Sequence, residues 1–378
     1  MNHNENAITL TYGTQILKMV QDLMEKTGAL DALRRDDTVV IKPNLVASRK
    51  DWVGVDTDPR VVEALVKMLK DRGISRITVG DGAGMGNSAT KAFSLCGYTE
   101  MAKRYGLELI DFEKDRFTKL EVPLAGPFRK LELARTALEC DFLISIPLMK
   151  AHFQTLMTCS LKNMKGIMSR SQKTSFHSRG LHKSIVQLAT VISPDLILVD
   201  GIHGNLTSET GRDPVAIGMM MAGKRPVEID SLVADILGYA PRDIKHIAYA
   251  EDAGLGTTNL EKISVQRLNR PAKEKRFAPP THYTKRFECR IEAEGACCTC
   301  MGNLIFALER LNEQGLLSQD QHFMVGQKAG ISSGISGTTI AVGQCAAKRI
   351  HADIQINDCP PTARTILRHV VADRRKPS

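Results

Sequence analysis

The chain has 378 residues, of which 43% are hydrophobic and 25% charged, so it reads as a globular protein of two or three domains. It has no apolar run of about 18 residues and opens on polar residues, which excludes a membrane-spanning helix and a signal peptide, and we expect a cytoplasmic protein with no membrane partner. The formal net charge of +9 favours anionic partners, but only 5% of residues are aromatic and no nucleic-acid-binding motif is present, which disfavours nucleic acid.

The first 266 residues alternate predicted helices and strands. Short apolar runs rich in β-branched residues predict buried strands over 38–42, 75–79, 107–111, 141–146 and 195–199. Apolar residues at helical spacing predict helices over 13–34, 59–72, 88–95, 100–105, 226–237 and 243–253. This alternation predicts an α/β fold, with a mostly parallel open sheet and helices on both faces.

The rest of the chain has a different character. Residues 271–294 are irregular, basic and contain proline, and we expect a linker or insertion over 267–295. Helices are predicted over 300–314 and 361–370, and a strand over 338–342, which indicates a smaller α+β region. We therefore divide the chain into an α/β domain (1–266), a basic linker (267–295) and a cysteine-rich C-terminal region (296–378).

Polar residues gather where the predicted strands end, which is the ligand-binding edge of an open α/β sheet. The first strand runs into Lys42 and Asn44, and the second into a glycine-rich loop, 80–86, that contains Asp81 and Gly82. Such a loop before a helix can hold an anion with its backbone amides, although a plain tight turn would look the same. Asp200 follows the strand over 195–199 as a cation ligand or salt-bridge partner.

The segment from Lys150 to His182 is the densest group of polar side chains in the sequence. Lysines supply charge for a carboxylate or phosphate, and histidines exchange protons near neutral pH. A solvated cationic face is the simpler reading, and a single histidine is more often structural. We nevertheless predict a substrate pocket. The residues predicted to act in catalysis are Lys150, His152, Lys162 and His177. Those predicted to bind the substrate are Lys42, Asn44, Asp81, Gly82, Asn163, Lys165, His182 and Asp200.

Six of the nine cysteines lie after residue 288. Cys297 and Cys300 form a Cys-x-x-Cys pair, and Cys345 and the proline-flanked Cys359 complete a four-thiolate set that favours a [4Fe-4S] cluster. Zinc usually uses two Cys-x-x-Cys pairs, and redox-active thiols are a further alternative. Cys298 is an alternate ligand to Cys297, and Cys289 is either a spare or another alternative.

An ordered series of short motifs resembles the family known as domain of unknown function 362. The motifs, in chain order, are Lys42-Pro-Asn44, Thr57-Asp-Pro59, Gly80-Asp-Gly82, Ala92-Phe with Gly97-Tyr98, Lys150-Ala-His152, Leu161-Lys-Asn-Met-Lys-Gly166, His177, Val199-Asp-Gly201, and Ala222-Gly with Asp230. Some members of that family carry iron–sulfur clusters, often in an added ferredoxin module with two four-cysteine runs. This chain lacks that module, so the resemblance implies a single cluster.

A weaker similarity is to the lactate racemase fold, in which a lysine and a histidine help to hold a nickel-pincer cofactor and further histidines move protons. By analogy, Lys162, Lys165, His152, His177 and His182 are candidates for comparable duties. This similarity implies a second metal or small cofactor whose identity the sequence leaves open.

Three functions remain open at this point. The first is a cluster-bearing enzyme that acts on a small anionic substrate, a carboxylate or a phosphate, by redox or lyase-type chemistry. The second is an electron-transfer or scaffold protein with no substrate of its own, which needs a redox partner protein. The third is a racemase-like enzyme that depends on a metal or cofactor. A homodimer is compatible with each.

Overall fold

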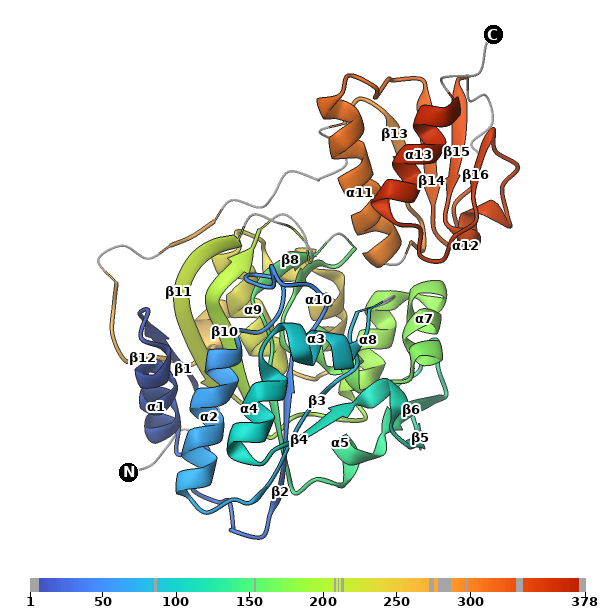
Figure 1. Cartoon of the computed structure of the whole chain (residues 1–378). Helices are drawn as coiled ribbons and strands as arrows, with labels where there is room; N and C mark the ends of the chain where they lie inside the picture. Colours follow the sequence, from blue (N-terminus) through green and yellow to red (C-terminus); the bar gives the residue numbers. More distant parts are fainter. Residues whose placement is uncertain are drawn as a thin grey trace. The chain divides into compact units, whose positions relative to one another are not determined.

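The computed structural model describes residues 7–84, 87–152, 154–206, 209, 211, 214–271, 275–277, 287–296, 298–330 and 336–373. The chain forms two compact units, which are described separately (Figure 1). The first contains residues 1–173 and 181–279, and the second contains residues 174–180 and 280–378. The boundary at 279/280 falls inside the predicted linker. None of the described helices is both long and apolar enough to cross a membrane.

An eight-stranded mixed sheet forms the centre of the first unit. In sheet order its strands are β12 (Val265–Arg267), β1 (Ile8–Tyr12), β11 (Pro214–Gly223), β10 (Leu196–Asn205), β7 (Phe142–Ile146), β2 (Thr38–Pro43), β3 (Arg76–Asp81) and β4 (Glu108–Asp111). All neighbouring pairs are parallel except β1 with β11 and β10 with β11. The predicted mostly parallel α/β sheet is confirmed, and the antiparallel strand β11 is an addition to it.

Two short hairpins accompany the large sheet. They are β5 (Phe117–Glu121) with β6 (Lys130–Ala134), and β8 (Lys150–His152) with β9 (Leu156–Thr158). The helices that lie wholly within the first unit are α1 (Ile16–Thr27), α2 (Pro59–Asp71), α3 (Ala89–Leu95), α4 (Tyr98–Tyr105), α5 (Arg135–Glu139), α6 (Ser160–Asn163), α8 (Leu181–Ala189), α9 (Pro226–Ile236) and α10 (Lys245–Asp252). Helix α7 (Arg170–Arg179) crosses from the first unit into the segment 174–180 of the second.

The ends of the first two helices follow from their sequence. Helix α2 begins at Pro59 after Asp58, whose carboxylate accepts a hydrogen bond from the Arg60 backbone N–H, a typical helix start. Helix α1 is shorter than the predicted 13–34, because Gly28 takes a left-handed conformation with φ of 59° and ends it. The apolar faces of both helices lie in the core of the first unit.

The second unit has a four-stranded sheet in which all strands are parallel and follow one another in chain order. The strands are β13 (Arg290–Glu292), β14 (Gln321–Val325), β15 (Thr338–Val342) and β16 (Ile354–Ile356), and the helices are α11 (Cys298–Glu313), α12 (Gln344–Ala347) and α13 (Ala363–Asp373). Strand β13 lies within the range predicted as a linker. This unit is the smaller C-terminal region that the sequence predicted.

Candidate functional site

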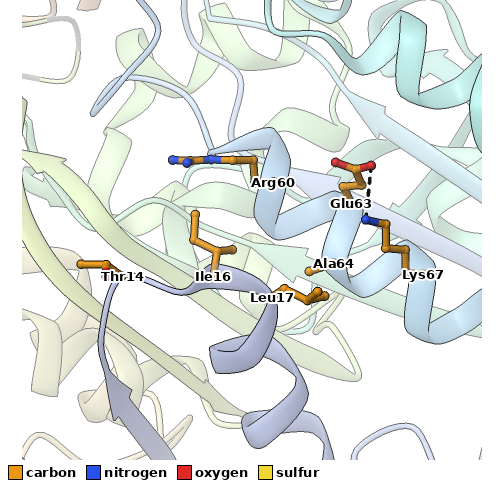
Figure 2. Close-up of a pocket in the computed structure, with 7 residues that line it drawn as sticks. All are labelled: Thr14, Ile16, Leu17, Arg60, Glu63, Ala64 and Lys67. Atoms are coloured by element: carbon orange, nitrogen blue, oxygen red, sulfur yellow. Dashed lines mark ion pairs between the residues drawn. The ribbon is translucent and has the colours of Figure 1, made fainter.

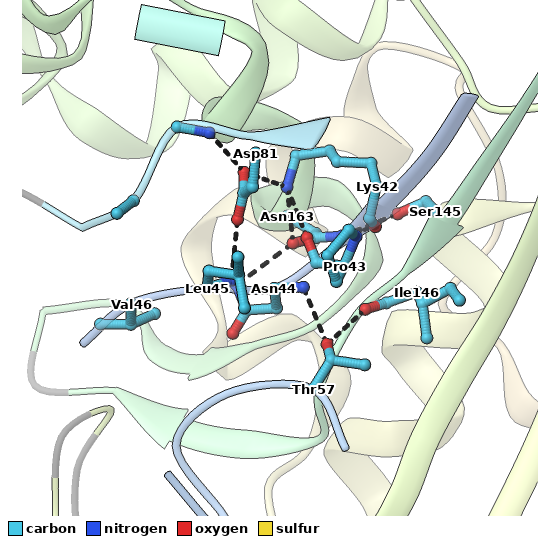
Figure 3. A network of polar contacts seen from close by, with 12 residues as sticks. Lys42, Pro43, Asn44, Leu45, Val46, Thr57, Asp81, Ser145, Ile146 and Asn163 are labelled. Atoms are coloured by element: carbon cyan, nitrogen blue, oxygen red, sulfur yellow. Dashed lines mark hydrogen bonds and ion pairs between the residues drawn. The ribbon is translucent and has the colours of Figure 1, made fainter. Parts of the chain in front are cut away.

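A buried ion pair lies at the carboxyl ends of β2 and β3. The Lys42 ammonium is 2.7 Å from the Asp81 carboxylate, and the two side chains are 1% and 2% exposed (Figure 3). Asp81 also accepts hydrogen bonds from the backbone N–H groups of Leu45 and Gly82. The two residues lie together because neighbouring parallel strands end at the same edge of the sheet. Burial lowers the pKa of Lys42 and raises that of Asp81, although each partner opposes the effect on the other.

Asn163 ties this pair to helix α6. Its side-chain oxygen accepts hydrogen bonds from Lys42 (3.1 Å) and from the Asn44 amide (3.2 Å), and its amide donates to Ser145. Helix α6 is fixed in turn by Asp230, whose carboxylate accepts the backbone N–H groups of Ser160 and Leu161. The structure thus brings together four predicted substrate-binding residues, Lys42, Asn44, Asp81 and Asn163, in a buried network that orders the sheet edge.

The glycine-rich loop is held from the other side by Lys173. The Lys173 ammonium donates to the backbone oxygens of Gly82 and Ala83 and pairs with Glu113 at 2.5 Å. Gly82 has no room for a side chain, because a Cβ there would lie 2.7 Å from the Gly166 oxygen. The remainder of the loop includes residues 85 and 86, which lie outside the described residues, so its anion-binding role stays a prediction.

Lys150 lies in a buried charged environment. It is fully buried on β8 and donates a short hydrogen bond to the Val55 oxygen. Burial lowers the pKa of Lys150 to about 8, partly opposed by the charge of Asp56. Burial also raises the pKa of Asp56 to about 6, although Asp56 accepts hydrogen bonds from the backbone of Val46 and Ala47. Both groups therefore change charge closer to neutral pH than they would in water.

His152, two residues further along β8, is held in one tautomer. Its Nδ1 accepts the backbone N–H groups of Gln154 (3.0 Å) and Thr155 (3.3 Å), so the proton of the neutral ring lies on Nε2. Nε2 faces the Glu209 carboxylate at 3.6 Å, and both side chains are almost fully buried. Any proton that His152 exchanges must therefore pass through Nε2.

The predicted residues Lys162 and His182 lie in the same unit, and the charge of Lys162 acts on His182. The positive charge of Lys162 contributes to lowering the pKa of both Lys150 and His182, although burial is the larger cause for each. The pKa of His182 falls to about 4. Gln154, which donates its N–H to His152, also contacts His182 through its backbone. The predicted cationic segment is thus a connected group and not only a solvated face.

The remaining predicted residues are Asp200, Lys165 and His177. Asp200 is within β10, which continues to Asn205 because β11 pairs with it. Its carboxylate accepts the backbone N–H groups of Asp58 and Ile202, and burial raises its pKa to about 7. Lys165 lies half-buried in the 3₁₀ turn Met164–Ile167. His177 lies in the segment 174–180, which belongs to the second unit.

In the second unit, the cysteine-bearing loops lie next to one another. Cys300 Sγ is 3.4 Å from where a Cβ on Gly343 would be, and Gly343 immediately precedes the helix that carries Cys345. The Gln344 backbone N–H donates to the Asp358 oxygen, which joins this loop to the one that carries Cys359. Cys297 and the Cys298 side chain lie outside the described residues. Within the described part of the chain, no group of three or more His, Cys, Asp or Glu side chains is arranged to hold a metal ion.

A surface cavity of about 260 Å³ lies elsewhere in the first unit, beside α1 and α2 (Figure 2). Its lining residues are Thr14, Ile16, Leu17, Arg60, Glu63, Ala64 and Lys67. Glu63 and Lys67 form an ion pair at 3.6 Å. None of the predicted site residues lines this cavity.

A family model described as "Domain of unknown function (DUF362)" matches residues 39–235, more than half of the chain. The protein belongs to the DUF362 family. This DUF362 protein is 27% identical over 256 residues to a thylakoid-associated protein of Synechocystis sp., a match that spans 65% of this chain and 77% of that protein.

Two solved structures are similar to this DUF362 protein. The lactate racemase apoprotein of Thermoanaerobacterium thermosaccharolyticum matches with 15% identity and a TM-score of 0.39, over 57% of this chain and 54% of that chain, or about half of the racemase. A structural-genomics protein from Thermotoga maritima matches with 13% identity and a TM-score of 0.43, over 82% of this chain and 71% of that chain. At this level of similarity, function has to be argued from the side chains themselves.

Three residues of the DUF362 site were not predicted from the sequence. Asp56 directly precedes the Thr-Asp-Pro motif, and that position was the one available signal. Glu209 lies in a polar stretch between two strands, where nothing in the pattern distinguishes it. His246 lies in a predicted helix and is fully buried beside His182, a contact that only the fold creates.

Proposed function

We propose that this DUF362 protein binds a [4Fe-4S] cluster in its second unit, through Cys297, Cys300, Cys345 and Cys359. The observation that carries the proposal is where these cysteines follow the strands of the small sheet along the chain. Each of the strands β13, β15 and β16 is followed within a few residues by a cysteine of this set. Because the strands are parallel, their carboxyl ends lie at one edge of the sheet.

The same topology narrows the choice of ligands. Cys289 directly precedes β13, so it lies at the opposite edge and is not a ligand. The Cys-x-x-Cys spacing in the sequence favours Cys297 over Cys298 as the partner of Cys300. Metal binding often completes the folding of its own site. We therefore expect the segments that follow β13, β15 and β16 to pack around the cluster as it forms.

Anaerobic purification followed by iron, sulfide and zinc analysis tests this proposal. We expect about four irons and four sulfides per chain, as for a Cys₄ cluster. Single Cys→Ser changes at 300, 345 and 359 should remove the visible absorbance of the cluster, whereas Cys289→Ser should leave it unchanged. Zinc as the sole metal, or equal effects of all four changes, would contradict the proposal.

We further propose that the first unit is the catalytic part of an enzyme that acts on a small anionic substrate. The buried groups Lys150 and Asp56 support this, because a catalytic acid or base works best with a pKa near the working pH. The buried contact between His152 Nε2 and the Glu209 carboxylate supports it as well. The pKa of Lys150, about 8, makes the ammonium an acid near neutral pH. His152 would donate or accept a proton at Nε2, and Glu209 would stabilise the charged ring.

The cluster, when bound, would supply single-electron chemistry, since four thiolate ligands leave iron no open position. A redox-type reaction is therefore favoured over lyase-type chemistry, and it requires a redox partner protein. An electron carrier without a substrate of its own would give Lys150 and His152 no ligand to contact.

Calorimetry with a panel of small carboxylates and phosphates separates an enzyme from a pure carrier. We expect at least one ligand to bind the wild-type protein, and Lys150→Met and His152→Asn to weaken that binding. Lys26→Met, which changes an exposed lysine on α1, should leave it unchanged. Failure of the whole panel to bind, with the cluster intact, would favour the carrier.

A further inference from the structure

Two histidine rings of the first unit face each other with nitrogens that lack protein partners. The rings of His182, on α8, and His246, on α10, are stacked with centroids 5.8 Å apart and planes inclined by 21°. Among the described residues, no hydrogen-bond partner exists for Nδ1 of His182 or for either nitrogen of His246. His246 is 0% exposed. Buried polar atoms nearly always have a partner, so these nitrogens indicate a bound water or ligand.

Among the described residues, the charged groups that affect the two rings are positive. Apart from burial, the group that lowers the pKa of both rings is the Lys162 ammonium, and Lys245 acts on His182 as well. In the part of the chain that the structure describes, no carboxylate shifts the pKa of either ring. Helix α10 also begins here with no side-chain cap and no acidic residue in its first turn, so its N-terminal N–H groups add partial positive charge. This surrounding favours an anion.

The hydrogen-bonding capacity of the rings restricts which anion fits. The backbone of Gln154 forms a hydrogen bond with His182 that raises the pKa of the ring, as expected for donation to a carbonyl, so the remaining nitrogen, Nδ1, carries a lone pair. A neutral His246 offers one N–H and one lone pair. The ligand must therefore accept a hydrogen bond from His246 and also donate at least one to a ring nitrogen, and a negative charge on it would be attracted to the Lys162 ammonium.

We propose that Lys162, His182 and His246 bind a phosphate group that carries a hydrogen, either inorganic phosphate or a phosphomonoester monoanion. Such a group combines negative charge with its own O–H, and both are needed here. Sulfate has the same tetrahedral shape as phosphate and the same charge as the hydrogen phosphate dianion, but it carries no hydrogen at neutral pH. His182 is only partly buried, which gives the pair an approach from solvent. This inference rests on the proposed small-anion function of the first unit, and it names a phosphate group as the anionic group that these side chains bind.

The test compares inorganic phosphate with sulfate by calorimetry on the full chain, and follows the histidine ring nitrogens by NMR during both titrations. We expect phosphate to shift the His182 and His246 resonances, and sulfate to bind at least about tenfold more weakly, since an unpaired buried lone pair costs roughly that factor or more. Methyl phosphate, titrated alongside, identifies whether the free ion or an ester is preferred. Equal binding of phosphate and sulfate, or unshifted ring resonances, would overturn the inference.

Single substitutions test whether phosphate binds at His182 and His246. His246→Phe keeps a buried ring but removes its nitrogens, and Lys162→Met removes the charge; each should weaken phosphate binding by about tenfold or more. Lys26→Met serves as the control. If His246→Phe does not fold, the wild-type NMR titration still decides the question. Binding of another anion that needs Lys150 and His152, without any response to phosphate, would overturn this inference while leaving the proposed enzyme intact.

Discussion

Asp81→Asn removes the charge partner of a fully buried lysine. Asparagine keeps the shape of the side chain but has one acceptor oxygen, so either Leu45 or Gly82 loses the acceptor of its backbone N–H. Breaking a buried ion pair from one side costs about 3–5 kcal/mol. Lys42 keeps its hydrogen bonds to the Pro43 oxygen (2.9 Å) and to Asn163 (3.1 Å). We therefore expect a loss at the lower end of this range, so that the unfolding free energy of the first unit falls by about 3 kcal/mol.

Urea unfolding followed by tryptophan fluorescence measures this loss. Trp52 is the one tryptophan of the sequence and packs against the core of the first unit, so its signal reports that unit. The double variant Lys42→Met with Asp81→Asn leaves no unpaired charge and should recover about 1–2 kcal/mol relative to Asp81→Asn alone. A loss below about 1 kcal/mol, typical of an exposed pair, would refute the reasoning, as would strict additivity of the two single changes.

Three further predictions concern other parts of the molecule. Asp230→Ala leaves the buried N–H groups of Ser160 and Leu161 without an acceptor, and should lower the unfolding free energy of the first unit by about 2 kcal/mol or more, measured by the same fluorescence. Gly343→Ala forces a side chain into a left-handed backbone with φ of 86° beside Cys300, and should cost about 1–3 kcal/mol, measured as a lower melting temperature of the second unit by circular dichroism; an unchanged temperature would contradict the packing. Asp200 has a folded-state pKa of about 7, above the ordinary value of about 4, so the folded state binds more protons in between and loses stability as the pH rises through this window. Asp200→Asn should therefore flatten the pH dependence of stability between about pH 4 and 7, and an unchanged slope would show that this carboxyl does not titrate there.

Patterns within single segments predicted the parallel strands well. Strands β2, β3 and β7 are short apolar runs. Such runs are typical of parallel strands that are buried on both faces. Strand β11 was missed because its methionines and glycines lack the expected β-branched signature, although β10 pairs along most of its length. Helix α7 was missed because it is polar on all sides and shows no apolar stripe.

Of the contacts in the candidate site, one could be predicted from the sequence and two could not. The Lys42–Asp81 pair follows from a general rule, because residues after neighbouring parallel strands meet at one edge. The contacts of His152 with Glu209, and of His182 with His246, depend on how distant loops and helices pack, which no local pattern encodes. The sequence therefore predicted that Lys42 and Asp81 meet at one edge of the sheet, but not that Glu209 contacts His152 or that His246 stacks on His182.

Strand β1 has a consequence for how the protein is made. Its two neighbours in the sheet, β11 and β12, both come far later in the chain, with Thr9 opposite Ala222 and Gln266. The large sheet therefore cannot close at this edge until more than two hundred further residues have been synthesised. Until then β1, an apolar strand with unpaired backbone groups, is exposed in the nascent chain, where chaperone binding would protect it from aggregation.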